Sequence, residues 1–314
     1  MKNSRERYRA MSVEERIELV ENLFINHPSF ERCFKKIEEC HQYSKISSEP
    51  QCLLITGEEP GVGKTTLCEQ YSALYPRVES EEKTKVIVLV ESIPIPATPK
   101  TLVSTLLTEI GDPLPDKGTT HIQTKRLFNL IKECGVEIII LDEFHHFIDR
   151  DSKKVLNTVS DWLKRLITKT KILVVLVGLP QSIKILEANS QLRRRFTRRG
   201  ELVNFKWLET PKANKSQTNE KAEKKNDKDY DYRSFLKILD EGLPMAEASH
   251  LAGRVIAYRM WEATHGNVDR TMKLVRYATG LALKRGEEKT TLPFLEQAYE
   301  ELFAGESPQN PFTD

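Results

Sequence analysis

One glycine-rich segment constrains the fold of this chain more than any other feature of its sequence. The segment GEEPGVGKTT covers residues 57–66, directly after the apolar run CLLIT and directly before the helical stretch LCEQYSALY. Glycines in such a loop allow backbone N–H groups to surround a phosphate, and the positive end of the following helix points toward it. The order strand, loop and helix therefore predicts a P-loop that binds ATP, rather than a glycine-rich turn without a ligand.

The residue types in this loop predict particular contacts with ATP and Mg²⁺. We expect Lys64 to contact the β- and γ-phosphates and so to take part in catalysis, and we expect Thr65 to bind Mg²⁺. The common spacing G-x-x-x-x-G-K-[ST] would place its first glycine at Glu58, but the glycine stands one residue earlier, so the loop is expected to be longer at its entry. The expected nucleotide-binding residues of the loop are Gly57, Pro60, Gly61, Val62, Gly63, Lys64, Thr65 and Thr66.

A second motif consists of the apolar run IIIL at 138–141 and two acids, Asp142 and Glu143. At the carboxyl end of a buried parallel strand these acids would lie beside the P-loop, because open α/β sheets bind ligands at that edge. We expect both to be catalytic: Asp142 supports Mg²⁺ through its water shell, and Glu143 orients and polarises the attacking water. Such strings are common at strand ends, but here a further strand and helix precede it, as this fold class requires. The motif therefore predicts hydrolysis of ATP as well as binding.

Two histidines, His145 and His146, follow the acids and allow a metal site. The sequence places no third ligand beside them, so we interpret them instead as polar residues that open a loop or helix.

Five short apolar runs alternate with helical stretches. Continuous runs of this length are typical of strands that are buried on both faces, and the alternation with helices predicts a parallel sheet of βαβ units. The expected fold is α/β, a three-layer P-loop ATPase of the AAA+ type with N-terminal helices and a small helical lid domain. The expected strands lie in CLLIT at 52–56, VIVLVE at 86–91, EIIIL at 137–141, KILVVLVG at 171–178 and ELVNF at 201–205.

Changes in composition predict the domain boundaries. Residues 210–231 are dense in Lys, Asn, Asp and Glu and contain no aliphatic residue larger than Ala, so this segment cannot bury a core. Helical apolar spacing before and after the core predicts helices at both ends of the chain. We therefore expect N-terminal helices over 1–48, the ATPase core over 49–209, a flexible charged insertion over 210–231, a lid domain over 232–304 and a disordered tail over 305–314.

The end of the fourth expected strand faces the γ-phosphate in this fold class, and a polar residue there commonly senses the nucleotide. The strand ends at Gly178, and the candidates that follow it are Gln181 and Ser182. In the lid, Arg270 follows a glycine-marked helix start, HGNVDR, and is the candidate for a second nucleotide sensor. The alternative is that Arg270 forms only a surface ion pair.

Five arginines lie close together at 193, 194, 195, 198 and 199, just before the last expected strand. They are either a solvated helical face or the source of an arginine finger that reaches the ATP of a neighbouring subunit. We favour the finger, with the catalytic candidates Arg194 and Arg195 first and Arg198 next. Some of these arginines could instead contact DNA phosphate.

Bulk composition limits the remaining classes of function. The five cysteines form no Cys-x-x-Cys pair and lie near no zinc-type His spacing, so neither a disulfide framework nor a zinc site is expected. The net charge of +2 is too small to indicate nucleic-acid binding by itself. No apolar run approaches the roughly 20 residues that span a bilayer, so we expect a cytoplasmic protein without a membrane partner.

Several segments of the chain resemble the AAA+ ATPases of DNA transposition, of the TniB/TnsC type, with MuB as a more distant relative. The proline-rich segment after the second strand is the most discriminating, because AAA+ proteins in general do not need it. Departures are the early Gly57, the insertion at 210–231 and the position of Arg270, one residue later than lid arginines often have. The resembling segments are FINHP at 24–28, PGVGKTT, IPIPATPKTLVSTLLTEIGDPLP at 93–115, IIILDEFHHF, VVLVGLPQS, LRRRF and GNVDRTMKLVRYA.

This resemblance implies a function and partners. It implies an ATP-dependent regulator that forms rings or filaments of its own subunits on duplex DNA and connects a target-selection protein with a transposase. Binding to DNA would then depend on phosphate contacts, with strong salt dependence and little sequence preference. Position within the family suggests Lys100 and Thr101 as DNA contacts.

Two other functions stay open at this point. An origin-recognition or loader-type AAA+ initiator would share the motifs but would normally add a winged-helix domain, and the residues after the insertion barely cover a lid. A nucleotide-gated signalling or toxin–antitoxin switch would bind ATP and a protein partner without DNA. The absence of DNA-stimulated ATPase activity would favour the switch.

Overall fold

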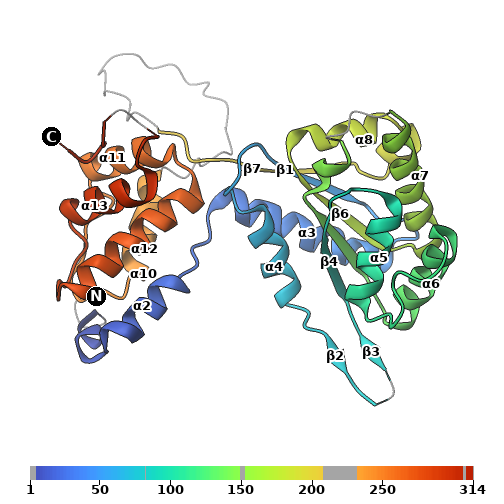
Figure 1. The fold of residues 1–314 in the computed structure, drawn as a ribbon, viewed down its shortest axis with the longest axis horizontal. Helices are drawn as coiled ribbons and strands as arrows, with labels where there is room; N and C mark the ends of the chain where they lie inside the picture. Colours follow the sequence, from blue (N-terminus) through green and yellow to red (C-terminus); the bar gives the residue numbers. More distant parts are fainter. Residues whose placement is uncertain (1–4, 82, 149–152, 208–231, 307–308, 314) are drawn as a thin grey trace, which may run out of the picture. The chain divides into compact units, whose positions relative to one another are not determined.

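The computed structural model describes residues 5–81, 83–148, 153–207, 232–306 and 309–313, and the chain forms two compact units (Figure 1). The sheet unit consists of Ser29–Val203, and the helical unit combines Met1–Pro28 with Asn204–Asp314. The expected insertion at 210–231 lies outside the described residues. No helix in the described ranges has the length and apolarity that a membrane span needs.

Five parallel strands form the sheet of the sheet unit, in the order β4-β5-β6-β1-β7. The expected α/β architecture is confirmed, since helices separate the strands along the chain and four of the strands nearly coincide with the expected runs. The strands are β1 (Leu53–Gly57), β4 (Val88–Ser92), β5 (Ile138–Asp142), β6 (Leu173–Gly178) and β7 (Arg198–Leu202), and a separate hairpin joins β2 (Val78–Glu79) to β3 (Thr84–Lys85).

Alternate side chains along β1, β4, β5 and β6 enter two separate cores, one on each face of the sheet. On β1, for example, Leu54 packs into the core that α5, α6 and α7 cover, whereas Ile55 packs into the core that α3 and α4 cover. Both faces are therefore buried, which explains why the strands read as continuous apolar runs. The helices are α3 (Pro28–Ile46), α4 (Lys64–Ala73), α5 (Pro99–Ile110), α6 (Thr120–Glu133) and α7 (Lys153–Thr170), and the short α8 (Lys184–Glu187) and α9 (Ser190–Arg193) follow β6.

The last strand differs from the sequence prediction. We expected it at 201–205, but β7 begins at Arg198, which pairs with Leu53, and ends at Leu202, which pairs with Gly57. β7 is an edge strand, so exposed arginine side chains are tolerated at its start. The centre of the strand is Gly200, where a Cβ atom would lie 3.0 Å from Cys33 Sγ and 3.2 Å from Ile55 Cγ1. Close packing against α3 and β1 thus determines the register, which apolar content alone does not reveal.

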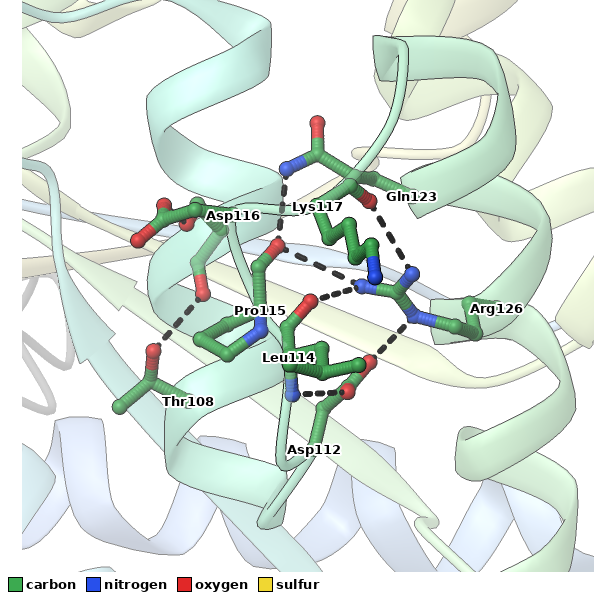
Figure 2. A network of polar contacts seen from close by, with 9 residues as sticks. Thr108, Asp112, Leu114, Pro115, Asp116, Lys117, Gln123 and Arg126 are labelled. Carbon is green, nitrogen blue, oxygen red and sulfur yellow. Dashed lines mark hydrogen bonds and ion pairs between the residues drawn. The ribbon is translucent and has the colours of Figure 1, made fainter.

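A polar network holds the connection between α5 and α6, which forms the end of the proline-rich segment (Figure 2). Nε of Arg126 donates to the carboxylate of Asp112 at 2.5 Å, and its two terminal nitrogens donate to the carbonyl oxygens of Leu114 and Lys117. The Asp112 carboxylate also accepts the N–H of Leu114 at 2.8 Å. One guanidinium on α6 therefore satisfies several acceptors of a loop that has no regular structure of its own.

Replacing Arg126 with alanine should lower the free energy of unfolding of the sheet unit by about 2–4 kcal/mol, because the 4%-exposed Asp112 side chain loses its partner. Urea unfolding followed by circular dichroism measures this change. The matched control is Lys125→Ala, an exposed neighbour on the same helix. A loss for Arg126→Ala no larger than that of the control would contradict the role given to the network.

The helical unit contains the expected lid helices together with the first residues of the chain. We expected one N-terminal region over 1–48, but the compact units divide it at Pro28, and α2 packs against α12. Arg16 on α2 is buried, donates to the Pro244 carbonyl at 2.8 Å and forms an ion pair with Glu288 at 3.0 Å. These contacts explain the division. The helices are α2 (Val13–Glu21), α10 (Tyr232–Gly242), α11 (Arg254–Thr264), α12 (Val268–Lys284) and α13 (Leu292–Phe303), preceded by the 3₁₀ helix η1 (Glu6–Ala10).

The end of the chain also differs from the disordered tail that we expected over 305–314. Phe312 is only 1% exposed, and its ring contacts that of Tyr299 on α13 with 6.1 Å between the centroids. Arg259 donates to the Phe312 carbonyl oxygen at 2.8 Å. The Phe312 ring and its carbonyl oxygen thus attach this segment to the helical unit.

Candidate nucleotide-binding site

The P-loop connects the carboxyl end of β1 to the amino end of α4, as the sequence predicts. Gly61 and Gly63 both have positive φ, 77° and 95°, which is the left-handed region that favours glycine. Gly63 is the N-cap of α4 and provides no side chain there, so the first N–H groups of the helix stay available for an anion. The local geometry is therefore that of a phosphate-binding loop.

The early glycine has a structural explanation. Gly57 is the last residue of β1, and a Cβ atom there would lie 2.6 Å from Cγ2 of Val62. Val62 is only 1% exposed, so the loop folds back over the strand end and packs its valine where a side chain of residue 57 would stand. Glycine is thus needed at position 57 for packing, and Glu58 and Glu59 begin the loop itself. Pro60 is exposed in the loop, and Thr66 is half-buried in the first turn of α4.

The side chain of Lys64 crosses the loop and contacts its backbone. Its Nζ atom donates to the carbonyl oxygens of Gly57 at 3.1 Å and Glu59 at 2.9 Å. Burial lowers the pKa of the Lys64 ammonium, while the nearby Glu143 and Asp142 act in the opposite direction. The ammonium group therefore lies between the loop and the acid pair, where it can bind a phosphate.

The two acids at the end of β5 occupy different environments. Asp142 is 1% exposed, and its Oδ2 atom accepts the hydroxyl of Thr65 at 2.7 Å. Its other oxygen accepts the N–H of Glu143 at 2.8 Å, and Glu143 has left-handed backbone angles, with φ 53°. The structure thus brings together Thr65 and Asp142, the two residues that we expected to bind Mg²⁺. The Glu143 side chain is half-buried.

Both histidines after the acids lie beside Glu143. Nε2 of His145 is 3.3 Å from Oε2 of Glu143, and Nε2 of His146 is 3.9 Å from the same oxygen. The cluster was not predicted from the sequence, because the third ligand is the glutamate of the acid pair and not a further residue. The 3₁₀ helix η2 (Phe144–Phe147), which turns both imidazoles back toward Glu143, could not be read from the motif.

The end of β6 leaves no room for a sensor side chain. A Cβ atom on Gly178 would lie 3.2 Å from the backbone nitrogens of Phe144 and His145 and 2.7 Å from Oγ of Ser182. Glycine is therefore required there by the close approach of η2, which explains why the usual Asn or Thr is absent. The candidates lie in the next 3₁₀ helix, η3 (Pro180–Ile183), where Ser182 is fully buried and Gln181 is half-buried. The sensor role of Gln181 stays a prediction.

The arginine cluster lies at the amino ends of the parallel strands, opposite to the P-loop. The N–H of Cys52, just before β1, donates to the carbonyl oxygen of Arg195 at 2.9 Å, whereas the P-loop follows the other end of β1. Arg198 and Arg199 belong to β7, so the helical-face interpretation does not hold for them. Arg194 is exposed and Arg195 is half-buried.

A cavity of about 480 Å³ adjoins these two arginines, and its lining includes Tyr43, Ser47, Gln51, Arg194, Arg195 and Thr197. The Nη1 atom of Arg195 is buried and forms no hydrogen bond with any residue in the described part of the chain.

The lid arginine is engaged within the helical unit. Arg270 donates to Glu306 at 2.6 Å, and its guanidinium carbon lies 4.1 Å from the centroid of the Phe303 ring. The ion pair that we named as the alternative for Arg270 is thus present, and the sensor role stays a prediction. A phosphate contact of Arg270 would have to replace Glu306.

The two expected DNA contacts lie in the first turn of α5. Lys100 is exposed. The Thr101 hydroxyl interacts with Oγ1 of Thr98 at 3.0 Å and donates to the Pro96 carbonyl at 2.8 Å, so it helps to cap the helix after the proline-rich loop. β4 precedes this loop, and its last residue pairs with Asp142. Lys100 and Thr101 therefore come after the carboxyl end of a strand, as the P-loop does.

Solved structures of AAA+ proteins share this fold. The ORC2 protein of Aeropyrum pernix, in ADPNP–ADP complexes, matches with a TM-score of 0.62 and 16% identity, over 93% of this chain and 72% of that chain. Cdc6p from Pyrobaculum aerophilum matches with a TM-score of 0.62 and 13% identity, over 92% and 72%. The A. pernix ORC1 protein in complex with DNA matches with a TM-score of 0.57 and 18% identity, over 88% and 66%.

Comparison with curated proteins gives no match. The family model described as bacterial TniB protein matches residues 16–207, which cover the P-loop, the acid pair, the proline-rich segment and the arginine cluster. That range includes more than half of the chain and every site residue discussed above except Arg270. The chain is therefore an AAA+ ATPase that belongs to the TniB family.

Proposed function

We propose that this protein is an ATP-dependent, DNA-binding regulator of transposition that oligomerises on duplex DNA and connects target selection with a transposase. The observation that carries the ATPase part is the hydrogen bond between Thr65 and the buried Asp142, with Glu143 beside it at the mouth of the P-loop. Membership of the TniB family supports the part that concerns transposition.

The residues at the loop fit Mg²⁺, because a hydroxyl and a carboxylate oxygen only 2.7 Å apart are hard oxygen donors of the kind that this ion prefers. Bound Mg²⁺ would neutralise charge on the β- and γ-phosphates of ATP. Lys64 would exchange its carbonyl partners for phosphate oxygens. Glu143 would orient a water and accept its proton. Gly57, Gly61 and Gly63 would act through the backbone conformation that they allow in the loop.

The position of the arginines supports action in trans. β1 separates them from the P-loop of their own subunit by a length of roughly 15 Å, which a side chain cannot span. The Nη1 atom of Arg195 lies beside the cavity and has no hydrogen-bond partner among the described residues, so a bound anion would satisfy this donor. A neighbouring subunit that presents its ATP to this edge would supply such an anion, so hydrolysis would depend on assembly.

The decisive experiment combines ATPase assays with electron microscopy of wild type and Lys64→Ala, with and without duplex DNA. We expect rings or filaments on DNA in the presence of ATP for wild type, and neither assemblies nor hydrolysis for Lys64→Ala. A wild-type protein that stays monomeric and hydrolyses ATP at the same rate with or without DNA would refute the regulator and favour the signalling switch.

Lys100→Ala should weaken binding to every DNA sequence and reduce the slope of log affinity against log salt concentration by about 1, because one phosphate contact is lost. Fluorescence anisotropy with two unrelated duplexes at several salt concentrations measures both effects. The control is Lys169→Ala. This exposed lysine lies in the last turn of α7, just before the amino end of a strand, so it is at the opposite ends of the strands from Lys100. Equal slopes for Lys100→Ala and wild type would remove Lys100 from the DNA surface.

A further inference from the structure

Glu143, His145 and His146 present three ligand atoms that all lie within 4.8 Å of one another. We propose that these residues form a binding site for a transition-metal dication such as Zn²⁺, distinct from the Mg²⁺ expected at Thr65 and Asp142. All three come from one short stretch of chain at the end of β5, so the site needs no rearrangement of separate elements to form.

The two distances from the Glu143 carboxylate to the imidazoles can be compared with those that a tetrahedral ion requires. Zinc bonds of 2.0–2.2 Å place neighbouring ligand atoms about 3.3–3.6 Å apart. The carboxylate oxygen of Glu143 is 3.3 Å from Nε2 of His145 and 3.9 Å from Nε2 of His146. A rotation of the half-exposed His146 ring suffices to close the longer separation. Three protein ligands would leave the fourth position for water.

The surroundings of His146 orient it as a metal ligand. Its Nδ1 atom lies 3.3 Å from the carbonyl oxygen of Ile93. When Nδ1 carries the proton and donates it to this carbonyl, Nε2 keeps its lone pair for a metal, which is the common arrangement at metal-bound histidines. The rings of His145 and His146 lie 4.5 Å apart between centroids, so both imidazoles face the same carboxylate. The backbone N–H of Glu143 is fixed by Asp142, which restricts the third ligand.

Ligand type decides which metal is expected. Two imidazoles and one carboxylate favour Zn²⁺, Ni²⁺ or Cu²⁺, whereas Mg²⁺ prefers an all-oxygen site. The Lys64 ammonium lies near Glu143 and opposes any dication there, so nitrogen ligands of high affinity are needed. A metal bound to Glu143 would occupy the oxygen that accepts the proton from water. Zn²⁺ would therefore inhibit ATP hydrolysis, a consequence that rests on the proposed function of Glu143, whereas binding itself does not.

Binding is tested on the full chain without nucleotide, by competition for Zn²⁺ with a chromogenic chelator. We expect one site whose affinity falls at least about tenfold in His145→Gln, His146→Gln and Glu143→Gln and is unchanged in His121→Gln, an exposed histidine on α6. Circular dichroism verifies that each variant is folded. Equal affinity in wild type and all three ligand variants would overturn the proposal.

Co²⁺ provides a second readout that separates this cluster from the five buried cysteines. Co²⁺ at the cluster should give weak visible bands without the intense thiolate charge-transfer band, and a thiolate band would overturn the assignment. Inhibition is then measured as the ratio of ATPase rates with and without micromolar Zn²⁺ in wild type and His121→Gln, followed by EDTA. We expect equal, reversible inhibition in both. If Zn²⁺ binds at the cluster while Glu143→Gln hydrolyses ATP normally, the site stands and the catalytic role of Glu143 fails.

Discussion

Glu143→Gln should lower the ATPase turnover about 10²–10⁴-fold while ATP binding is retained, because the amide cannot accept the proton of the attacking water. The phosphate contacts expected from the loop and Lys64 do not involve the Glu143 side chain. Its backbone N–H bond to Asp142 is also independent of the side chain. The variant should therefore bind ATP and stay assembled on DNA longer than wild type does.

The measurement pairs steady-state phosphate release with the binding of a fluorescent ATP analogue. Lys64→Ala serves as the contrasting variant, since it should lose binding and hydrolysis together. Glu133→Gln is the matched control, because this exposed glutamate at the end of α6 lies outside the site and should leave both quantities unchanged. Turnover of Glu143→Gln within a few-fold of wild type would mean that another residue activates the water.

The sheet was predictable because burial on both faces leaves a direct signature in the sequence. β1, β5 and β6 consist almost entirely of apolar residues, and a short continuous apolar run of this kind predicts a buried strand. β7 lacks this signature, since it begins with Arg198 and Arg199 and is held by the packing of Gly200. The position of this edge strand depends on its packing against neighbouring elements, and the sequence does not show which elements those are.

The candidate site shows the same contrast between local and tertiary information. The P-loop and the two acids are contiguous motifs, so their residues could be named from the sequence, and the structure brings Thr65 to Asp142. The cluster of Glu143 with His145 and His146 depends on a 3₁₀ turn and on the left-handed backbone of Glu143, which a residue pattern does not reveal. The attachment of α2 to the helical unit depends on contacts more than two hundred residues apart, such as that between Arg16 and Pro244.

Arg195→Ala should lower the ATPase rate of assembled protein about 10³-fold or more, because a guanidinium that stabilises charge on the γ-phosphate is lost. An isolated subunit should bind ATP as tightly as wild type does, since Arg195 lies at the other end of β1 from its own P-loop. Arg194→Ala is measured in parallel, and Arg193→Ala is the control, an exposed arginine at the end of α9. A larger loss for Arg194→Ala would assign the finger to that residue.

Mixing two inactive variants distinguishes action in trans from a structural role of Arg195. In a mixture of Arg195→Ala and Glu143→Gln subunits, both of which should bind ATP and assemble, some interfaces combine an intact acid pair from one subunit with an intact arginine from the other. Random assembly through a head-to-tail interface makes about a quarter of the interfaces competent, so the mixture should recover about that fraction of the wild-type rate. Each variant alone can form no such interface. An inactive mixture that still assembles on DNA would exclude a finger in trans, because a donor acting on a neighbouring subunit must be rescued by a neighbour that retains it.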